Sequence, residues 1–508
     1  MRSIFRGRKR RKSEQTAKVE DTATRVSSSL QENIDTIKEK LCHSQDLVFR
    51  SIEFNGQKGV LVFIEALTDQ SQVQKSIIKP LVKVREGKLE EVIIATYLQQ
   101  TESFDKIIEH LVRGDSILLF SRSEQAFIVG TDATEKRNMA EPDNETVVRG
   151  AHDGLVENIR VNLYNIRHRI QNPNLTVKFF RVGTETQSKL VMLYMRNLAH
   201  PDLVKEVEKR IKAIRTDTII SPGFMTEFME DRPASPFPQV LYTERPDRVV
   251  SNLMEGRVVM LGEGDPTAVV LPVTLFAFYQ TPDDYHSRWM IGSFVRFVRL
   301  MSFLIAFLLP SLYIAIVEFH PEVLHISLIY SMKSSIEHVP FPAIIEALLM
   351  ELTIELIREA GIRLPSRVGQ TIGIVGGLVI GDAVVRAGLV SNTMLIVVAL
   401  TAISSFVVPS HEMSTAIRVL RFPQMLAAFS FGFFGIVVGM VIIFMHLVKL
   451  ESFGTPYLAP FAPLRVKDMK DTFIRLPIWK LNQRPHDPHP QRMKQEEPSR
   501  GWKDDEDN

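Results

Sequence analysis

The chain has 508 residues, of which 45% are hydrophobic and 24% are charged, and its formal net charge is +2 at pH 7. This hydrophobic content excludes a chain that is unstructured throughout. The single cysteine, Cys42, excludes an intrachain disulfide framework and a metal site built from several cysteines.

The sequence before residue 290 predicts a basic tail followed by a soluble α/β head of two subdomains. The tail, residues 1–29, has seven Lys or Arg among its first twelve positions and lacks the apolar core of a signal peptide. In the first subdomain, residues 30–135, a helix is expected from Ser29, and two hairpins are expected around Asn55-Gly56 and residues 121–125. The second subdomain, residues 136–290, has predicted strands at 175–181, 190–195, 258–261 and 267–271 and predicted helices at 154–170 and 202–214.

Three long uncharged segments predict a polytopic α-helical membrane domain at residues 291–450. They are residues 300–317, 389–409 and 425–447, and about 20 apolar residues are enough to cross a hydrocarbon core roughly 30 Å thick. Further apolar stretches raise the expected number of spans to four or five. Residues 451–508 are predicted to be a polar cytoplasmic tail that is largely disordered at its end.

The distribution of basic residues predicts the orientation of these spans. Arg288, Arg296 and Arg299 precede the first span and place the head in the cytoplasm. Five spans would leave the C-terminal tail outside, although residues 465–484 carry six Lys or Arg, which is typical of a cytoplasmic segment. An even number of spans brings this tail inside but would put Arg418 and Arg421 outside. We favour the even number.

Residues 340–357 are apolar except for three glutamates, which is unusual for a membrane anchor. At 100° per residue Glu351 and Glu355 share one face of a helix, while Glu346 lies opposite. Carboxylates at membrane depth face a bundle interior or a water-filled cavity, which would suit a pore or vestibule that attracts cations. An amphipathic helix lying at the membrane surface is the alternative, and both interpretations remain open.

Glycine recurs every fourth residue in the segment that follows, at Gly369, Gly373, Gly377 and Gly381. A stripe without side chains lets a neighbouring helix approach closely. The neighbour belongs either to the same chain or to another subunit around a central pore. Asp382 and Arg386 come directly after the stripe, at a spacing that suits an ion pair or the mouth of such a pore.

Motifs typical of catalysis are missing from the sequence. It contains no phosphate-binding GxxxxGK[ST], no HExxH, no GxSxG and no dinucleotide fingerprint. His486 and His489 flank Asp-Pro in a polar segment, where solvated side chains are more common than a metal site. We therefore expect no enzyme activity, no cofactor and no bound metal.

Several short strings follow one another between residues 141 and 463. They are Glu-Pro at 141–142, Val-Val-Arg-Gly at 147–150, Gly-Leu-Val-Glu-Asn at 154–158, Arg-His-Arg-Ile at 167–170, Pro-Phe-Pro-Gln at 236–239, Glu-Arg-Pro-Asp at 244–247, Glu-Gly-Arg at 255–257, Asp-Tyr at 284–285 with Arg288, and the proline-rich run at 454–463. In their order and spacing these strings resemble the A subunit of GerA-type spore germination receptors. The resemblance covers about residues 30–470. Two local departures, Glu-Gly-Asp-Pro at 263–266 and His286, leave it intact.

This resemblance implies a subunit of a nutrient-sensing receptor in the inner membrane of a bacterial spore, with its head on the cytoplasmic side. It implies a polytopic, transporter-like B subunit, a lipoprotein C subunit, further copies of the A subunit and membrane lipid as partners, and no nucleic acid. In that family the A subunit is regarded as the transducing component and as an oligomeric ion channel. A membrane scaffold without channel activity is one alternative, and a transporter is another, although the chain lacks the two homologous halves typical of transporters.

Overall fold

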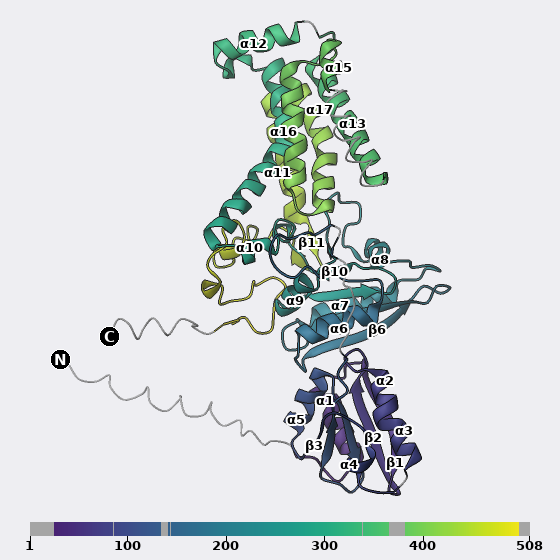
Figure 1. Cartoon of the computed structure of the whole chain (residues 1–508). Coiled ribbons are helices and arrows are strands. Elements are labelled where there is room, and N and C mark those ends of the chain that lie inside the picture. Colours follow the sequence, from purple (N-terminus) through teal and green to yellow (C-terminus); the bar gives the residue numbers. More distant parts are fainter. Residues whose placement is uncertain are drawn as a thin grey trace, which may run out of the picture. The chain divides into compact units, whose positions relative to one another are not determined.

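The computed structural model describes residues 25–84, 86–133, 141–142, 144–337, 339–364 and 381–496 (Figure 1). The expected basic tail and the expected C-terminal end therefore lie mostly outside the described residues. Backbone contacts divide the chain into two compact units. The first comprises Met1–Arg137 and Leu163–Lys178, and the second comprises Asn138–Asn162 and Phe179–Asn508.

The first unit contains an antiparallel five-stranded sheet in the order β1-β2-β4-β5-β3. The two hairpins predicted from the turn residues are confirmed, and Asn55 and Gly56 adopt the positive φ values of 52° and 69° that the tight turn needs. The elements are α1 (Leu30–Lys40), β1 (Leu47–Phe54), β2 (Gln57–Ile64), α2 (Gln70–Gln72), η1 (Val73–Ile78), α3 (Lys79–Lys83), α4 (Leu89–Val92), β3 (Leu98–Thr101), α5 (Phe104–Arg113), β4 (Ser116–Phe120) and β5 (Ala126–Val129).

Both faces of this sheet are covered, because successive side chains of a strand point to opposite sides. On β2, Val60, Val62 and Ile64 pack against the core formed with α1 and α5. Leu61 and Phe63 belong to a second core, formed with the helices between residues 73 and 93. The predicted α/β layering is thus present in this unit.

A buried ion pair gives a structural role to Arg167, the first residue of the string Arg-His-Arg-Ile at 167–170. Arg167 of α6 (Ile159–Arg169) donates from Nε to Asp46 Oδ2 at 2.6 Å and from Nη2 to Ser44 Oγ at 2.8 Å. Arg167 and Asp46 are 2% and 1% exposed. Since each charge is fully satisfied, the pair fastens α6 to the segment before β1.

The second unit contains another five-stranded sheet, in the order β6-β7-β9-β10-β8. The four predicted strands are present, but the predicted helix at 154–170 begins only at Ile159. The reason is that Leu155 N donates to the carbonyl oxygen of Glu244 at 2.7 Å, which holds residues before 159 in an extended segment. The elements are β6 (Leu175–Val182), β7 (Ser188–Met195), α7 (Pro201–Ala213), α8 (Pro222–Met229), β8 (Leu241–Thr243), α9 (Pro246–Met254), β9 (Val258–Gly262), β10 (Ala268–Leu271), η2 (Leu275–Phe278) and α10 (Asp283–His286).

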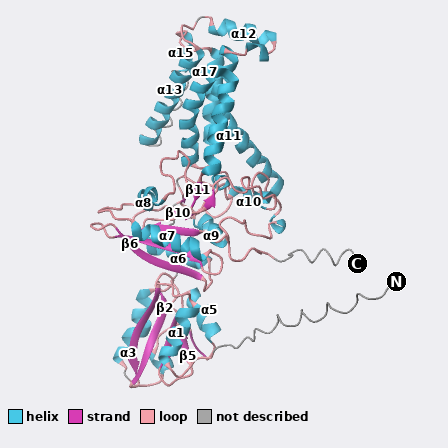
Figure 2. Cartoon of the chain, turned by 180° about the vertical axis from the view of Figure 1, so that it is seen from behind, coloured by secondary structure: helices cyan, strands magenta, loops and turns pink. Residues whose placement is uncertain are grey.

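Apolar helices of the same unit lie side by side as a bundle, which Figures 1 and 2 show from opposite directions. Among the described residues, α11 and α17 are long and apolar enough to cross a membrane, and α16 is shorter but also apolar. The elements are α11 (Trp289–Glu318), η3 (Pro321–Val323), α12 (Ile326–Ile336), α13 (Ala343–Arg363), α15 (Gly381–Arg386), α16 (Asn392–Val407) and α17 (His411–Lys449).

The expectation of one continuous span at residues 425–447 is wrong, because α17 folds back on itself at Gly432. This glycine has the non-helical angles φ 60° and ψ −138°. Gln424 Nε2 donates to the carbonyl oxygen of Ile436 at 2.9 Å, whereas twelve residues of a straight helix would separate these groups by about 18 Å. The two halves of α17 therefore form an antiparallel helical hairpin.

Contacts at the two ends of the bundle give the direction of each helix. We call the end that meets the sheet of the second unit the sheet end, where His446 Nε2 lies 2.8 Å from Ser235 Oγ. At the far end the His320 ring stacks on Phe433 with centroids 4.8 Å apart, directly beside Gly432. The first half of α17 thus starts at the sheet end, so Arg418 and Arg421 lie toward the sheet. The expectation that an even number of spans puts these two arginines on the opposite side is therefore wrong.

The segment after α17 returns to the sheet of the second unit. Ser452 Oγ donates to the carbonyl oxygen of Gln239 at 2.7 Å and accepts from Val273 N at 3.2 Å. The carbonyl oxygen of the fully buried Tyr457 accepts from Leu275 N at 2.8 Å. Of the segment that the sequence predicted as a polar tail, residues 452–459 are mostly buried beside this sheet, whereas most of residues 460–496 are exposed or half-buried. The segment includes β11 (Glu451–Ser452), β12 (Thr455–Pro456), η5 (Asp468–Asp471) and η6 (Ile478–Lys480).

Candidate functional site

The glutamates of α13 point at arginines of α17. Glu351 forms an ion pair with Arg421, and their side chains are 2% and 3% exposed. Glu355 pairs with Arg418 at 2.5 Å and is 28% exposed. The two glutamates share a face, as the helical spacing predicted, and that face packs on α17.

Arg358 completes what we call the membrane charge cluster, which consists of Glu351, Glu355, Arg358, Arg418 and Arg421. Arg358 Nη2 donates to Ser405 Oγ at 2.8 Å, and its guanidinium lies 4.4 Å from the centre of the Phe406 ring. Within the described residues, Arg421 Nε and Nη2, Arg358 Nε and Glu351 Oε1 are buried without a hydrogen-bond partner. Three arginines face two glutamates, so the cluster carries an excess positive charge in an apolar bundle.

Glu346 has a separate structural role. It is 1% exposed, and its Oε2 accepts from Ser391 N at 2.8 Å, directly before the start of α16. An acidic group is favourable there because the first backbone N–H groups of a helix have no helical partner. Since α13 buries Ala347 and Met350 as well, it packs among the other helices of the bundle.

The remaining predicted site residues are only partly described. Gly369, Gly373 and Gly377 lie outside the described residues, and Gly381 and Asp382 begin α15 with side chains that are not described. Arg386 ends this short helix. The pore interpretation of these residues and of Glu351 and Glu355 stays a prediction.

A second set of charges lies where α11 leaves the sheet, and sequence reasoning took it only for a basic flank. Asp284 of α10 is 1% exposed and accepts from Arg296 Nε at 2.9 Å and from Arg299 Nη1 at 2.8 Å. Arg296 Nη1 also reaches Asp471 Oδ1 at 2.7 Å, and Tyr285 OH donates to Asp471 Oδ2 at 2.6 Å. We call these five residues the entry cluster. The spacing of Asp284 from the two arginines was the available signal for it.

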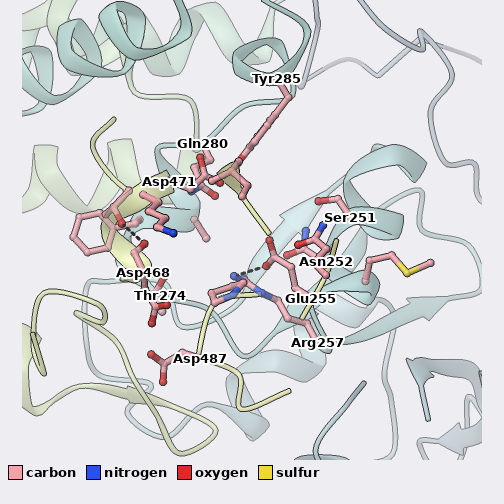
Figure 3. Close-up of a pocket in the computed structure, with 18 of the residues that line it drawn as sticks. Ser251, Asn252, Glu255, Arg257, Thr274, Gln280, Tyr285, Asp468, Asp471 and Asp487 are labelled. Carbon is pink, nitrogen blue, oxygen red and sulfur yellow. Dashed lines mark hydrogen bonds and ion pairs between the residues drawn. The ribbon is translucent and has the colours of Figure 1, made fainter. Parts of the chain in front are cut away.

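A cavity of about 440 Å³ opens beside the entry cluster (Figure 3). Its walls are α9, the segment at 274–286 and the C-terminal segment between residues 459 and 496. Figure 3 shows Glu255 and Arg257 joined by an ion pair, which measures 3.1 Å, on one side of the cavity, and Asp468, Asp471 and Asp487 on the other. We refer to this cavity as the junction pocket.

Burial changes the acidity of two groups in the wall of this pocket. It raises the pKa of Glu255, although the charge of Arg257 acts in the opposite direction. Burial also raises the pKa of Tyr285 well above that of a free phenol, so its hydroxyl remains a hydrogen-bond donor to Asp471. No group of three or more His, Cys, Asp or Glu that could hold a metal ion occurs among the residues that the structure describes.

The raised pKa of Glu255 predicts a pH dependence of stability. Glutamate titrates near 4.3 in an unfolded chain, so the folded state favours protonated Glu255, and this stabilisation is lost as the pH rises through the higher folded-state pKa. Glu255→Gln should therefore gain thermal stability relative to the unchanged protein as the pH rises above the unfolded-state pKa of glutamate. Unfolding midpoints of the full chain in detergent test this, with Glu227→Gln on the exposed face of α8 as the control. Parallel curves for both proteins would contradict it.

Comparisons with known proteins identify close relatives. Residues 35–487 match the model of the family described as Bacillus/Clostridium GerA spore germination protein. The chain is 39% identical over 469 residues to spore germination protein B1 of Bacillus subtilis, which covers 91% of this chain and 97% of that protein. It is 38% identical over 471 residues to spore germination protein GerLA of Bacillus cereus, with 91% and 96% covered.

Two further similarities are to a membrane protein and to a crystal structure. The chain is 37% identical over 476 residues to the uncharacterized membrane protein YfkQ of Bacillus subtilis, with 92% and 93% covered. The crystal structure of the N-terminal domain of the A subunit of the Bacillus megaterium spore germinant receptor GerK3 aligns with 49% of this chain and 96% of that domain, at 25% identity and a TM-score of 0.38.

Proposed function

Because the chain belongs to the GerA family of spore germination proteins, we propose that it is the A subunit of a nutrient-sensing germination receptor in the inner membrane of the spore. The observation that carries this proposal is the extent of the family match, which runs from residue 35 to residue 487 and so includes both sheets, the helices and the C-terminal segment. Its proposed partners are a polytopic B subunit, a lipoprotein C subunit and further copies of this chain.

We propose a multi-pass topology with the sheets and both chain ends in the cytoplasm. α11 and the first half of α17 run from the sheet end to the far end, whereas α13, α16 and the second half of α17 run back. The described helices make five passages, of which the first begins and the last ends at the sheet end. This agrees with the basic residues that precede α11 and follow α17 in the sequence.

The proposed role of the subunit is to pass a nutrient signal to the membrane helices and to conduct ions. The entry cluster supports the first part, because it ties Asp284 and Asp471 outside the bundle to the first turns of α11. The membrane charge cluster supports the second part, because unpartnered charged groups inside a bundle are typical of ion pathways. A scaffold subunit or a transporter without channel activity remains the alternative.

Nutrient-triggered release of monovalent cations from spores tests this proposal. In a strain whose other receptors of this family are deleted, removal of this chain should abolish release, and the unchanged gene should restore it. Persisting release in the deletion strain would contradict the receptor assignment.

A single substitution separates the channel from the scaffold. Glu355→Gln should change the rate of cation release several-fold at unchanged protein abundance, since Glu355 is the partly exposed carboxylate of the cluster. Glu359→Gln is the matched control, one turn along α13, because Glu359 is 58% exposed and pairs with Arg363. Equal release from both variants would favour the scaffold.

A further inference from the structure

The acidic side chains of the junction pocket are already engaged by cations of the chain. Asp468 accepts from His486 at 2.8 Å, and Glu255 pairs with Arg257 at 3.1 Å. Three arginines outside the pocket lining hold three further aspartates. These pairs are Asp247 with Arg245 at 2.6 Å, Asp471 with Arg296 at 2.7 Å and Asp487 with Arg465 at 2.6 Å. Four of the six acidic side chains in the lining are therefore paired with an arginine, and a fifth, Asp468, is hydrogen-bonded to His486.

The charged groups of the pocket lining that still lack a partner are mostly hydrogen-bond donors of arginine and lysine. Arg257 is 7% exposed, yet its Nε and Nη1 have no partner among the described residues. Lys467, Lys470 and Lys480 line the same cavity at its exposed rim, and none of them forms an ion pair with a described carboxylate. The unused acceptors in the lining are fewer, namely Glu496 at the rim and Asp487 Oδ1.

A buried guanidinium that lacks two hydrogen bonds lowers the stability of the folded protein. An unsatisfied buried polar group costs on the order of 1–3 kcal/mol, and more when it is charged. The planar fork of arginine matches the two oxygens of a carboxylate or a phosphate. Figure 3 shows the guanidinium of Arg257 beside Glu255 in the wall of the pocket.

We propose that the junction pocket is a binding site for a small soluble oxyanion, a carboxylate or phosphate compound of the cytoplasm. Arg257 donates to one of its oxygens at the buried wall, and the three lysines attract it at the rim. The cavity of about 440 Å³ has the size of a metabolite site. This site goes beyond the proposed function and does not depend on whether the helices conduct ions.

The position of the site would let its occupant act on the membrane helices. Arg257 lies between α9 and β9, whereas Lys467 and Lys470 lie on the C-terminal segment that carries Asp471. Gln280 Nε2 fixes the same segment by donating to the carbonyl oxygen of Asp471 at 2.8 Å. An anion that draws both walls together therefore restrains Asp471, and through it Arg296 of α11.

Anion titrations of the full chain in nanodiscs of phosphatidylcholine test the site. Sodium phosphate and sodium succinate are each titrated against sodium chloride of equal ionic strength, with calorimetry for affinity and the thermal midpoint for stabilisation. At least one of the two should bind and raise the midpoint, and the two arms distinguish a phosphate ligand from a carboxylate. If neither binds, the proposal is overturned.

Variants of the pocket locate the binding. Arg257→Gln should weaken the affinity at least ten-fold, and the rim variant Lys467→Gln/Lys470→Gln should weaken it at least three-fold. Lys205→Gln, at an exposed position of α7, should leave it unchanged. If Arg257→Gln does not fold, the rim variant decides, since both lysines are exposed. Wild-type affinity in the pocket variants that fold would place the anion elsewhere and overturn the proposal.

Discussion

Replacing Gly435 by alanine is expected to break the hairpin of α17. A Cβ atom at residue 435 would overlap the carbonyl oxygen of Ala427 in the opposite half of the hairpin, and a backbone atom cannot move aside as a flexible side chain can. The two halves must then separate along their length. Because overpacking of a close contact costs about 1–3 kcal/mol and occasionally more, we expect destabilisation by about 3 kcal/mol.

The matched control is Gly361→Ala in α13, where nothing lies within 4 Å of the added methyl group. Alanine is the better helix former by about 1 kcal/mol, so this variant should be as stable as the unchanged chain or more so. Thermal unfolding midpoints in detergent and the amount of folded protein in membranes measure both effects. A common response of the two variants would show that Gly435 does not lie at a close helix contact.

The second large effect is expected from the ion pair between Glu351 and Arg421. Arg421→Met leaves a carboxylate that is 2% exposed without its partner, and breaking a buried pair in this way costs about 3–5 kcal/mol. The double variant Glu351→Leu/Arg421→Met removes both charges and should recover most of that loss, because a buried pair and apolar residues of similar volume are often equally stable.

A double-mutant cycle of unfolding midpoints measures this coupling. The exposed pair of Glu359 with Arg363 on the same helix serves as the reference, and there Arg363→Met should cost less than about 0.5 kcal/mol. If the double variant were as unstable as Arg421→Met alone, the two charges would not be coupled. Such a result would also remove the structural explanation for Glu351 and leave ion conduction as its main role.

The sequence predicted those parts of the fold whose signals are local. Asn55-Gly56 identified the hairpin of β1 and β2, because only a few residue types adopt the positive φ of its turn. The hairpin of β4 and β5 was predicted from the polar turn at residues 121–125 between two apolar runs, and its register confirms this. The strands β3 and β8 have only four and three residues, too few for an alternating pattern, and they are defined by the neighbours they pair with.

The candidate site depended on contacts between distant residues, which a single sequence does not reveal. A charge at membrane depth predicts that Glu351 has a partner, but that partner is Arg421, 70 residues further along. The break at Gly432 was missed because a glycine in an apolar run is ordinarily tolerated within a helix. The reversal follows instead from the backbone angles of Gly432 and from the hydrogen bond of Gln424 to Ile436 across the hairpin.

The return of residues 451–496 to the second sheet has a consequence for how the protein is made. On the ribosome, the strands up to β10 emerge long before Ser452 and Tyr457, with all the apolar helices in between. Val273 N and the carbonyl oxygen of Gln239 lack their Ser452 partner during that time. The second unit can therefore complete the core around its sheet only after the apolar helices have been synthesised and the last segment has been released, so this core forms at the end of synthesis.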